Sequence, residues 1–178
     1  MAERTIYLAG GCFWGVEHLM RQLEGVTGTC VGYANGTGEA DATYQTVCAG
    51  HTGFKETVRV RWDPERTTLG FLLHAFFEVI DPTTPNRQGN DVGTQYQAGI
   101  FWDPDDGETG VDVALVCADV RERTPGFCVL VEPLTNFFPA EDYHQDYLMK
   151  NPGGYCHVSP AAIARLAAES RQDRSAHA

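Results

Sequence analysis

The apolar and polar positions along the chain follow two periods, which predict a mixture of strands and helices. Residues 57–62 alternate between apolar and polar side chains, as in a strand with one buried face. Between residues 69 and 80 the large apolar residues recur at helical spacing, and Thr68 before them is a suitable N-cap. Strands are expected at 5–9, 30–33, 57–62, 95–102 and 128–133, and helices at 16–23, 69–80, 111–122, 140–149 and 160–168.

The order of these elements favours an α+β sandwich, in which an antiparallel or mixed sheet carries helices packed against it. No internal repeat or linker divides the chain, so we expect one domain over residues 1–178. The loops 34–53 and 81–94 are longer than most connections, and loops of that length often carry function. Residues 150–178 read as a long, irregular C-terminal extension, and we expect disorder at 171–178.

The charge of the chain narrows the classes of partner. There are 24 acidic and 13 basic residues, and the formal net charge is −11. Nucleic acids and anionic membrane surfaces would be repelled, so we expect neither as a partner. No apolar run is long enough to span a bilayer, and the N-terminus lacks the pattern of a signal peptide. These features favour a cytoplasmic protein.

The segment around Cys12 carries the strongest chemical signal. It reads Ala-Gly-Gly-Cys-Phe-Trp-Gly over residues 9–15, where a strand is expected to become a helix. Unpaired N–H groups and the dipole at a helix N-terminus stabilise negative charge, which predicts a lowered thiol pKa and a reactive thiolate. The flanking glycines would let a substrate approach the sulfur. The alternative is that Cys12 is a small buried residue in a tight turn.

The other five cysteines differ in their surroundings. No C-x-x-C pair occurs and the histidines show no ligand spacing, so we expect no metal site. Cys30, Cys48, Cys117 and Cys128 lie in runs that we expect to pack in the interior. Cys156 ends a segment rich in turn-forming residues, which is expected to be mobile and exposed. A cysteine in such a segment can reach another sulfur.

Four ordered blocks of glycine, polar and aromatic residues lie between residues 11 and 156. They read Gly-Cys-Phe-Trp-Gly at 11–15, Arg-Gln-Gly-Asn-Asp-Val-Gly-Thr-Gln-Tyr at 87–96, Ala-Glu-Asp-Tyr-His-Gln-Asp-Tyr at 140–147 and Asn-Pro-Gly-Gly-Tyr-Cys at 151–156. Together they resemble the peptide methionine sulfoxide reductases of the A class, from about residue 5 to residue 156. The resemblance implies a ferredoxin-like two-layer sandwich and a monomer that reduces methionine-S-sulfoxide, protein-bound or free, in protein repair.

The resemblance also implies the roles of two cysteines and two aromatic residues. Cys12 matches the nucleophile that attacks the sulfoxide sulfur and becomes a sulfenic acid. Cys156 matches the resolving cysteine, which forms a disulfide with Cys12 that thioredoxin then reduces. Phe13 and Trp14 match the apolar pocket for the S-methyl group of the substrate. No bound cofactor is implied.

Four further residues match groups that act on the sulfoxide oxygen. Glu56 corresponds to the acid that protonates this oxygen, and a desolvated carboxyl with a raised pKa could do so. Tyr44 and Tyr96 correspond to hydroxyl donors that hold the same oxygen while charge develops. Asp91 corresponds to a carboxylate that organises this network. The resemblance therefore implies that these residues also bind the substrate.

Two positions beside Glu56 depart from the pattern of the family. Phe54 stands where the family usually has His, and loss of this polar neighbour would raise the pKa of Glu56 further. Lys55 stands where a small residue is common, and a nearby ammonium group would lower that pKa. The departures affect the expected rate and pH optimum, and leave the reaction class unchanged.

Two other functions remain open on the residues alone. Cys12 could pair with His144 or His51 in an acyl transferase or hydrolase, which requires an imidazole within hydrogen-bond reach of the sulfur. A redox-sensing module could instead use the aromatic pocket to hold oxidised methionine without turnover. The presence of Cys12, Glu56 and Cys156 together argues against the second possibility.

Overall fold

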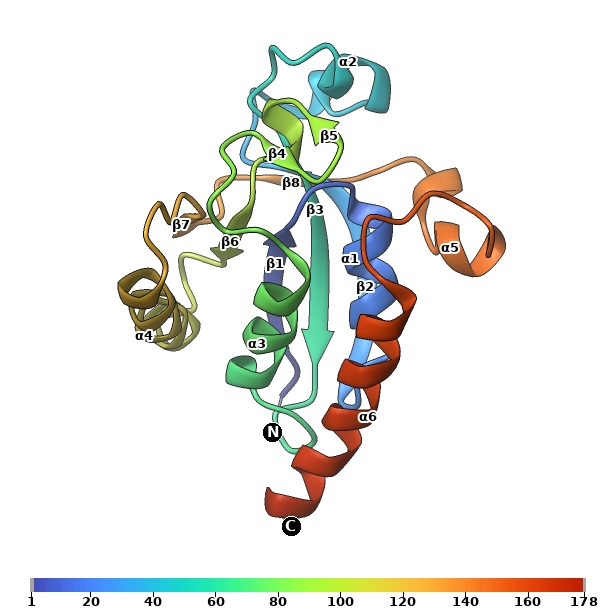
Figure 1. Cartoon of the computed structure of the whole chain (residues 1–178). Helices are drawn as coiled ribbons and strands as arrows, with labels where there is room; N and C mark the ends of the chain where they lie inside the picture. The colour runs from blue at the N-terminus through green and yellow to red at the C-terminus, as the bar shows by residue number, and fades with distance from the viewer. Residues whose placement is uncertain (1, 178) are drawn as a thin grey trace.

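A computed structural model describes the backbone of residues 2–177 and the side chains of residues 2–172, and a six-stranded sheet forms the centre of this part (Figure 1). The strand order is β7-β6-β1-β3-β2-β8, and neighbouring strands are antiparallel except for the parallel pair β6 and β7. The strands are β1 (Arg4–Ala9), β2 (Val26–Ala34), β3 (Lys55–Trp62), β6 (Gly99–Trp102), β7 (Leu130–Pro133) and β8 (Phe137–Pro139).

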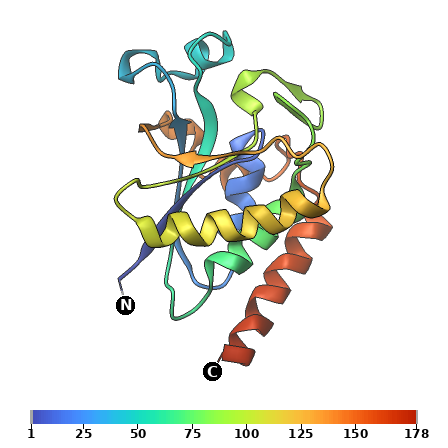
Figure 2. The ribbon, with the colours of Figure 1, turned by 90° about the vertical axis from the view of Figure 1, so that its left-hand side faces the viewer.

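Helices α1, α3 and α6 lie together on one face of the sheet, as the two perpendicular views show (Figures 1 and 2). Helix α4 lies beside α3 and also contacts β6 and β7. The helices are α1 (Phe13–Met20), α2 (Tyr44–Cys48), α3 (Leu69–Val79), α4 (Gly107–Arg123), α5 (Tyr147–Lys150) and α6 (Pro160–His177). Three single turns of 3₁₀ helix and a hairpin complete the described part of the chain: η1 (Glu39–Asp41), η2 (Thr94–Tyr96), η3 (Asp142–His144), β4 (Arg87–Gln88) and β5 (Asp91–Val92).

The main core lies between the sheet and these helices. Every second residue of β1 and β3 faces it, because strand side chains alternate between the two faces. Its largest fully buried members include Ile6, Leu8, Leu19, Leu72 and Phe76. Full burial of each such side chain contributes about 1.5–3 kcal/mol, so this layer fixes α1 and α3 against the sheet.

The pairing of β1 with β3 decides where the functional groups meet. The two strands are antiparallel, and Leu8 pairs with Val58. The end of β1, which leads to Cys12, therefore lies beside the start of β3, which carries Glu56. Strand β2 runs on the other side of β3, with Tyr33 opposite Glu56.

The expected α+β class and mostly antiparallel sheet are confirmed, and several elements match closely. The strand expected at 57–62 extends to Lys55–Trp62, and the helix expected at 111–122 extends to Gly107–Arg123. Thr68 caps α3 as predicted, since its hydroxyl accepts a hydrogen bond from the N–H of Phe71 at 3.1 Å.

Two elements differ from the expected ones: one strand is shorter, and one helix is divided. The strand expected at 95–102 is limited to Gly99–Trp102, because Gln97 binds the backbone of Asn86 and Cys128 through its side chain. The helix expected at 140–149 is divided into η3 and α5. Asp146 separates them with a left-handed φ of 55°, and Glu17 accepts a hydrogen bond from its N–H at 3.0 Å.

The C-terminal helix is longer than expected. Helix α6 continues to His177, beyond the predicted end at 168 and across residues expected to be disordered. Ile163 and Leu166 are buried in the core. The hydroxyl of Ser170 accepts a hydrogen bond from the N–H of Glu24 at 3.0 Å, which fixes the helix further along. The irregular part of the extension is limited to residues 151–159, and Ala178 lies outside the described residues.

Candidate active site

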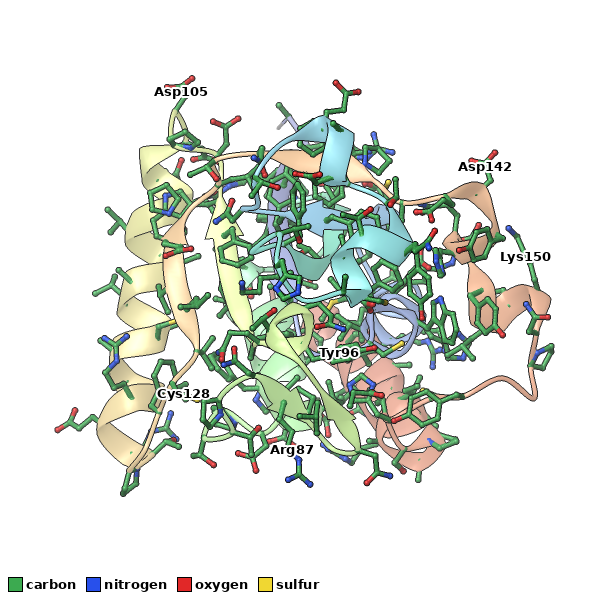
Figure 3. All side chains as sticks on the ribbon, turned by 90° about the horizontal axis from the view of Figure 1, so that it is seen from above. Arg87, Tyr96, Asp105, Cys128, Asp142 and Lys150 are labelled. Atoms are coloured by element: carbon green, nitrogen blue, oxygen red, sulfur yellow. The ribbon has the colours of Figure 1, made fainter. Side chains whose placement is uncertain are left out.

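A cavity of about 110 Å³ lies at the end of the sheet where β1 leads into α1. All of the predicted site residues except Cys156 line it, and they come from α1, α2, β3, β5 and η2. Tyr155 also lines it, although the sequence did not identify this residue as part of the site. The lining residues are Cys12, Phe13, Trp14, Tyr44, Glu56, Asp91, Tyr96 and Tyr155. In Figure 3, which looks onto this end of the molecule, Tyr96 lies near the middle of the view.

Cys12 is held at the N-cap of α1 by a tight turn after β1. Gly11 adopts a φ of +82°, a conformation that residues with a Cβ rarely take. A Cβ on Gly11 would lie 2.6 Å from the Cβ of Gln88, so a side chain has no room there. The turn brings Cys12 to the cavity with its side chain half-buried.

The predicted lowering of the Cys12 pKa is wrong. Burial raises the pKa of this thiol well above its ordinary value, and negative charge on Glu56 and Asp91 adds to the rise. A hydrogen bond from the backbone N–H of Trp14 acts in the opposite direction and does not outweigh the effect of burial. Cys12 is therefore a neutral thiol at pH 7.

Glu56 is the most deeply buried carboxyl of the cavity, at 2% exposure. One of its oxygens accepts a hydrogen bond from the N–H of Phe13 at 3.1 Å, which ties β3 to the first turn of α1. Burial raises the Glu56 pKa to about 8; the charge of Asp91 adds to this, and the N–H of Phe13 opposes it. At neutral pH this group is a protonated acid in the same cavity as the Cys12 sulfur.

The two residues before Glu56 face opposite sides of β3. Phe54, on the same side as Glu56, is fully buried, with its ring 6.4 Å from that of Tyr33 and 6.0 Å from that of Phe138. Lys55 donates a hydrogen bond to the carbonyl of Gly53 at 2.6 Å. The charge of Lys55 does not contribute to the upward shift of the Glu56 pKa, and burial is the largest cause of that shift.

Three tyrosine hydroxyls complete the polar part of the cavity. Burial raises the pKa of Tyr44 and of Tyr96 well above its usual range, so both remain hydrogen-bond donors at any physiological pH. The hydroxyl of Tyr155 donates to a carboxylate oxygen of Asp91 at 3.1 Å. This bond joins the segment before Cys156 to the β4–β5 hairpin. The position of Tyr155 directly before Cys156 was the signal in the sequence that could have identified this residue as part of the site.

An aromatic cluster supports Trp14 from behind. The indole ring stacks on Tyr147 with centroids 3.7 Å apart and planes at 10°. Its N–H donates to Nδ1 of His144 at 3.1 Å, and the His144 ring also lies 4.6 Å from that of Tyr44. Glu141 fixes α2 in place, because one carboxylate oxygen accepts from the N–H of Tyr44 at 3.1 Å and the other from the hydroxyl of Tyr33 at 2.9 Å.

The pairing of Cys12 with a histidine gains no support from this geometry. His144 is buried behind the cavity and its Nδ1 is occupied by Trp14. Burial also lowers the His144 pKa, and His51 is exposed on the loop after α2. Neither histidine lines the cavity that contains the Cys12 sulfur.

Cys156 lies outside this cavity and lines a larger neighbouring one of about 570 Å³. Its thiol donates to the carbonyl of Val158 at 3.2 Å, and both Cys156 and Cys12 are free thiols. Burial raises the pKa of the Cys156 thiol above its ordinary value. Of the cysteines expected in the interior, Cys117 is buried, Cys30 and Cys128 are half-buried, and Cys48 is exposed, contrary to expectation.

Over the described residues, no cluster of three or more His, Cys, Asp or Glu side chains could bind a metal ion. Over the same range, no helix is both long and apolar enough to cross a membrane.

Comparison with known proteins identifies a family. A family model described as peptide methionine sulfoxide reductase matches residues 4–175. The curated peptide methionine sulfoxide reductase MsrA of Clostridium botulinum (strain Hall) is 46% identical over 155 residues, which cover 87% of this chain and 98% of that protein.

Two solved structures extend the similarity to three dimensions. The crystal structure of Mxr1 from Saccharomyces cerevisiae in reduced form matches with a TM-score of 0.81 and 38% identity, over 88% of this chain and 91% of that chain. Mxr1 in complex with Trx2 matches with a TM-score of 0.56 and 26% identity, over 82% of this chain and 84% of that chain.

Proposed function

We propose that the chain, which belongs to the peptide methionine sulfoxide reductase family of oxidoreductases, reduces methionine-S-sulfoxide. The reaction takes place in the 110 Å³ cavity, and Cys12 supplies the attacking sulfur. The observation that carries the proposal is the presence of the Cys12 thiol and the buried, protonated Glu56 carboxyl in one small cavity. Reduction of oxidised methionine, and hence repair of oxidised proteins, is the activity of this family. The substrate here is methionine sulfoxide in peptides and in free form.

The chemical step transfers oxygen from one sulfur to another. The Cys12 sulfur attacks the sulfoxide sulfur and forms a transient S–S bond. This bond and the S–O bond of the substrate then break as the protonated oxygen passes to Cys12. Glu56 donates its proton to the sulfoxide oxygen and takes up the proton that leaves the Cys12 thiol. Thiol and sulfoxide thus become sulfenic acid and thioether without net proton release. Because both groups are neutral at the start, no charge is buried before the substrate arrives.

The remaining polar residues act on the developing oxygen charge. Tyr44 and Tyr96 donate hydrogen bonds from hydroxyls that stay protonated because burial raises their pKa. Asp91 is held by Tyr155 and orients this group of donors. Phe13 and Trp14 enclose the methyl group of the substrate, and the stacking of Trp14 on Tyr147 keeps that wall rigid.

Recycling of the enzyme uses the second cysteine. The Cys156 thiol attacks the Cys12 sulfenic acid, water leaves, and a Cys12–Cys156 disulfide forms. An external dithiol then reduces the disulfide, and we assign this step to thioredoxin. The complex of the similar Mxr1 with Trx2 supports that assignment.

The same family resemblance bears on the fold. The strands β6-β1-β3-β2, with α1 after β1 and α3 after β3, form a β-α-β-β-α-β unit. We propose that this unit is the ferredoxin-like sandwich of the family.

Separated sulfoxide epimers and two cysteine variants test the function. Reduced protein should convert the S epimer and leave the R epimer unchanged. Cys12→Ser should lose all activity, because no other described sulfur lines the cavity. Cys156→Ser should release one equivalent of methionine, and mass spectrometry should then find an oxidised Cys12. Turnover by Cys12→Ser would contradict the proposal, and Cys30→Ser, which alters a free cysteine that lines neither cavity, serves as the control.

A further inference from the structure

Two carboxyl groups of the described residues are almost fully buried, those of Glu56 and Glu17, and each residue is 2% exposed. Glu56 lines the 110 Å³ cavity, whereas Glu17 lies on α1 and does not line it. Burial raises the pKa of Glu17, and a buried carboxyl group costs free energy unless its oxygens are hydrogen-bonded. The reaction described above gives Glu17 no role, so its partners indicate what it does in the fold.

The two oxygens of Glu17 bind different parts of the chain. One accepts a hydrogen bond from the hydroxyl of Thr29 on β2 at 2.9 Å, and the other from the N–H of Asp146 at 3.0 Å. Asp146 has a left-handed φ of 55°, which is an unfavourable conformation for a residue with a Cβ. Its carboxylate also forms an ion pair with Arg21, but this pair is partly exposed and contributes little. The bond to Glu17 is therefore the main restraint on Asp146.

The conformation of Asp146 determines where the next side chain points. Asp146 is the N-cap of α5, and Tyr147 is the first residue of that helix. The ring of Tyr147 stacks on that of Trp14, with centroids 3.7 Å apart and planes at 10°. Trp14 and Glu17 are three residues apart on α1 and therefore share one face of the helix. This face binds residues 146 and 147 at two points, so the bond from Glu17 sets the position of the ring that supports Trp14.

The position of the Trp14 ring determines the size of the space beside Cys12. The cavity has a volume of about 110 Å³, and Trp14 forms one of its walls. An apolar pocket discriminates against one additional methylene group only if its walls resist displacement, and such discrimination reaches about 10–200-fold. A wall that yields would admit a larger substituent and would make poorer contact with a small one.

We propose that Glu17 is a positioning residue, which fixes Trp14 through residues 146 and 147 and thereby makes the cavity select S-methyl sulfoxides over sulfoxides with larger S-alkyl groups. The proposal rests on the proposed function, in which Trp14 encloses the methyl group of the substrate. Glu17 lies outside the cavity and exchanges no proton with the substrate. Its removal should therefore alter the choice between substrates, whereas the chemical step keeps Cys12 and Glu56.

Three variants separate this role from a general contribution to stability. Glu17→Met keeps the length of the side chain and removes both acceptor oxygens. Glu17→Gln can keep both bonds, because its carbonyl oxygen accepts from the N–H of Asp146 and its NH₂ group donates to the hydroxyl of Thr29. Thr29→Val is the matched control, since it removes the other bond of the same carboxyl group and leaves the bond to Asp146 in place.

For each protein we would measure the single-turnover rate constants for methionine-S-sulfoxide and for the S epimer of ethionine sulfoxide, which has one additional methylene group on sulfur. The preference of the wild-type protein for the methyl compound should fall by about fivefold or more in Glu17→Met. The preference should change less than about twofold in Glu17→Gln and in Thr29→Val. A general loss of folded protein would lower both rates equally and leave their ratio unchanged.

An unchanged preference in Glu17→Met, or a wild-type protein that reduces both sulfoxides equally well, would overturn the role of Glu17 and leave the reductase function intact. Equal losses of preference in Thr29→Val and Glu17→Met would also overturn it, because the bond to Asp146 would then not be the cause. Failure of the wild-type protein to reduce methionine-S-sulfoxide would overturn the proposed function and the role of Glu17 together.

Hydrogen exchange in the wild-type protein tests the central contact without a variant. The N–H of Asp146 should exchange at least about tenfold more slowly than that of Gly153, an exposed residue in the loop after α5, because a buried carboxyl oxygen of Glu17 holds it. Both rates would be measured by NMR and corrected for the intrinsic exchange rate of each residue. Equal corrected rates would show that Glu17 does not hold Asp146 and would overturn the proposal.

Discussion

At the scale of single residues, the site combines a neutral thiol, the proposed nucleophile, with a neutral carboxyl, the proposed acid. Burial that keeps the Cys12 thiol protonated also raises the pKa of Glu56 to about 8. Protonation of Glu56 removes the nearest negative charge, which would otherwise raise the Cys12 pKa further. The protonation states of the two groups are therefore coupled, and the proposed reaction starts from the state with both protons in place.

Glu56→Gln should slow the chemical step by about a hundredfold or more, because the amide cannot donate a proton of comparable acidity. Substrate binding should change much less, since the side chain keeps its shape. The pH dependence should also differ. The wild-type rate should fall as the pH rises through about 8, where Glu56 loses its proton, and this decline should be absent from the variant. Single-turnover rates between pH 5 and 9 measure both effects.

Glu122→Gln, at an exposed position on α4, provides the control for this experiment. An unchanged rate in Glu56→Gln would show that another group supplies the proton. A wild-type profile that is flat through pH 8 would show that Glu56 is not titrating in the step that is measured.

At the scale of elements, the turn between β1 and α1 determines where the sulfur lies. Gly11 has a left-handed φ of +82° and contacts Gln88, whose side chain binds the backbone of Asp81. The turn is thereby joined to the loop that leads to the β4–β5 hairpin and Asp91. The position of Cys12 and that of Asp91 thus depend on the same contact.

Gly11→Ala should destabilise the protein more than Gly50→Ala, although the two glycines have almost the same φ, +82° and +83°. At Gly50 a new Cβ meets no atom within 4 Å, so only the left-handed conformation costs free energy, about 1–2 kcal/mol. At Gly11 the new Cβ would also collide with Gln88 at 2.6 Å. Urea denaturation would measure the difference. Equal losses in the two variants would show that Gln88 moves aside freely.

At the scale of the whole molecule, α6 returns the end of the chain to the domain. It packs against α3, Arg165 forms an ion pair with Glu78 of α3, and Ser170 binds the backbone of Glu24. These contacts fix one wall of the 570 Å³ cavity that Cys156 lines. The part of the chain after Cys156 therefore supports the segment that carries this cysteine.

Ser170→Ala should lower the free energy of unfolding by about 1–3 kcal/mol, because it leaves the N–H of Glu24 without its hydroxyl acceptor in a half-buried position. Single-turnover reduction of methionine sulfoxide should be unchanged at 25 °C, since Ser170 lies far along the helix from both cavities. Thermal unfolding would measure the effect, with Gln172→Ala at an exposed position as the control. Equal stability of the two variants would show that this contact adds nothing.

The sequence was sufficient for features that depend on local pattern. Alternation located β3, the hydroxyl of Thr68 located the start of α3, and the resemblance brought Cys12, Glu56, Tyr44, Tyr96 and Asp91 to one site, where the structure places them. It was insufficient where distant residues decide. The raised pKa of Cys12 results from burial by segments far along the chain. Tyr155 lines the cavity and binds Asp91, which is distant in sequence. The length of α6 depends on Glu24, which is distant in sequence.

The raised pKa of Cys12 has a consequence for an enzyme that works while oxidants are present. Peroxides react with thiolates far faster than with thiols. A sulfur that keeps its proton is therefore oxidised by peroxides more slowly. In the proposed mechanism its reaction with a sulfoxide requires a carboxyl group that can donate a proton to the sulfoxide oxygen. The raised pKa of Cys12 would thus slow the reaction of this thiol with peroxides while leaving its proposed reaction with methionine sulfoxide available.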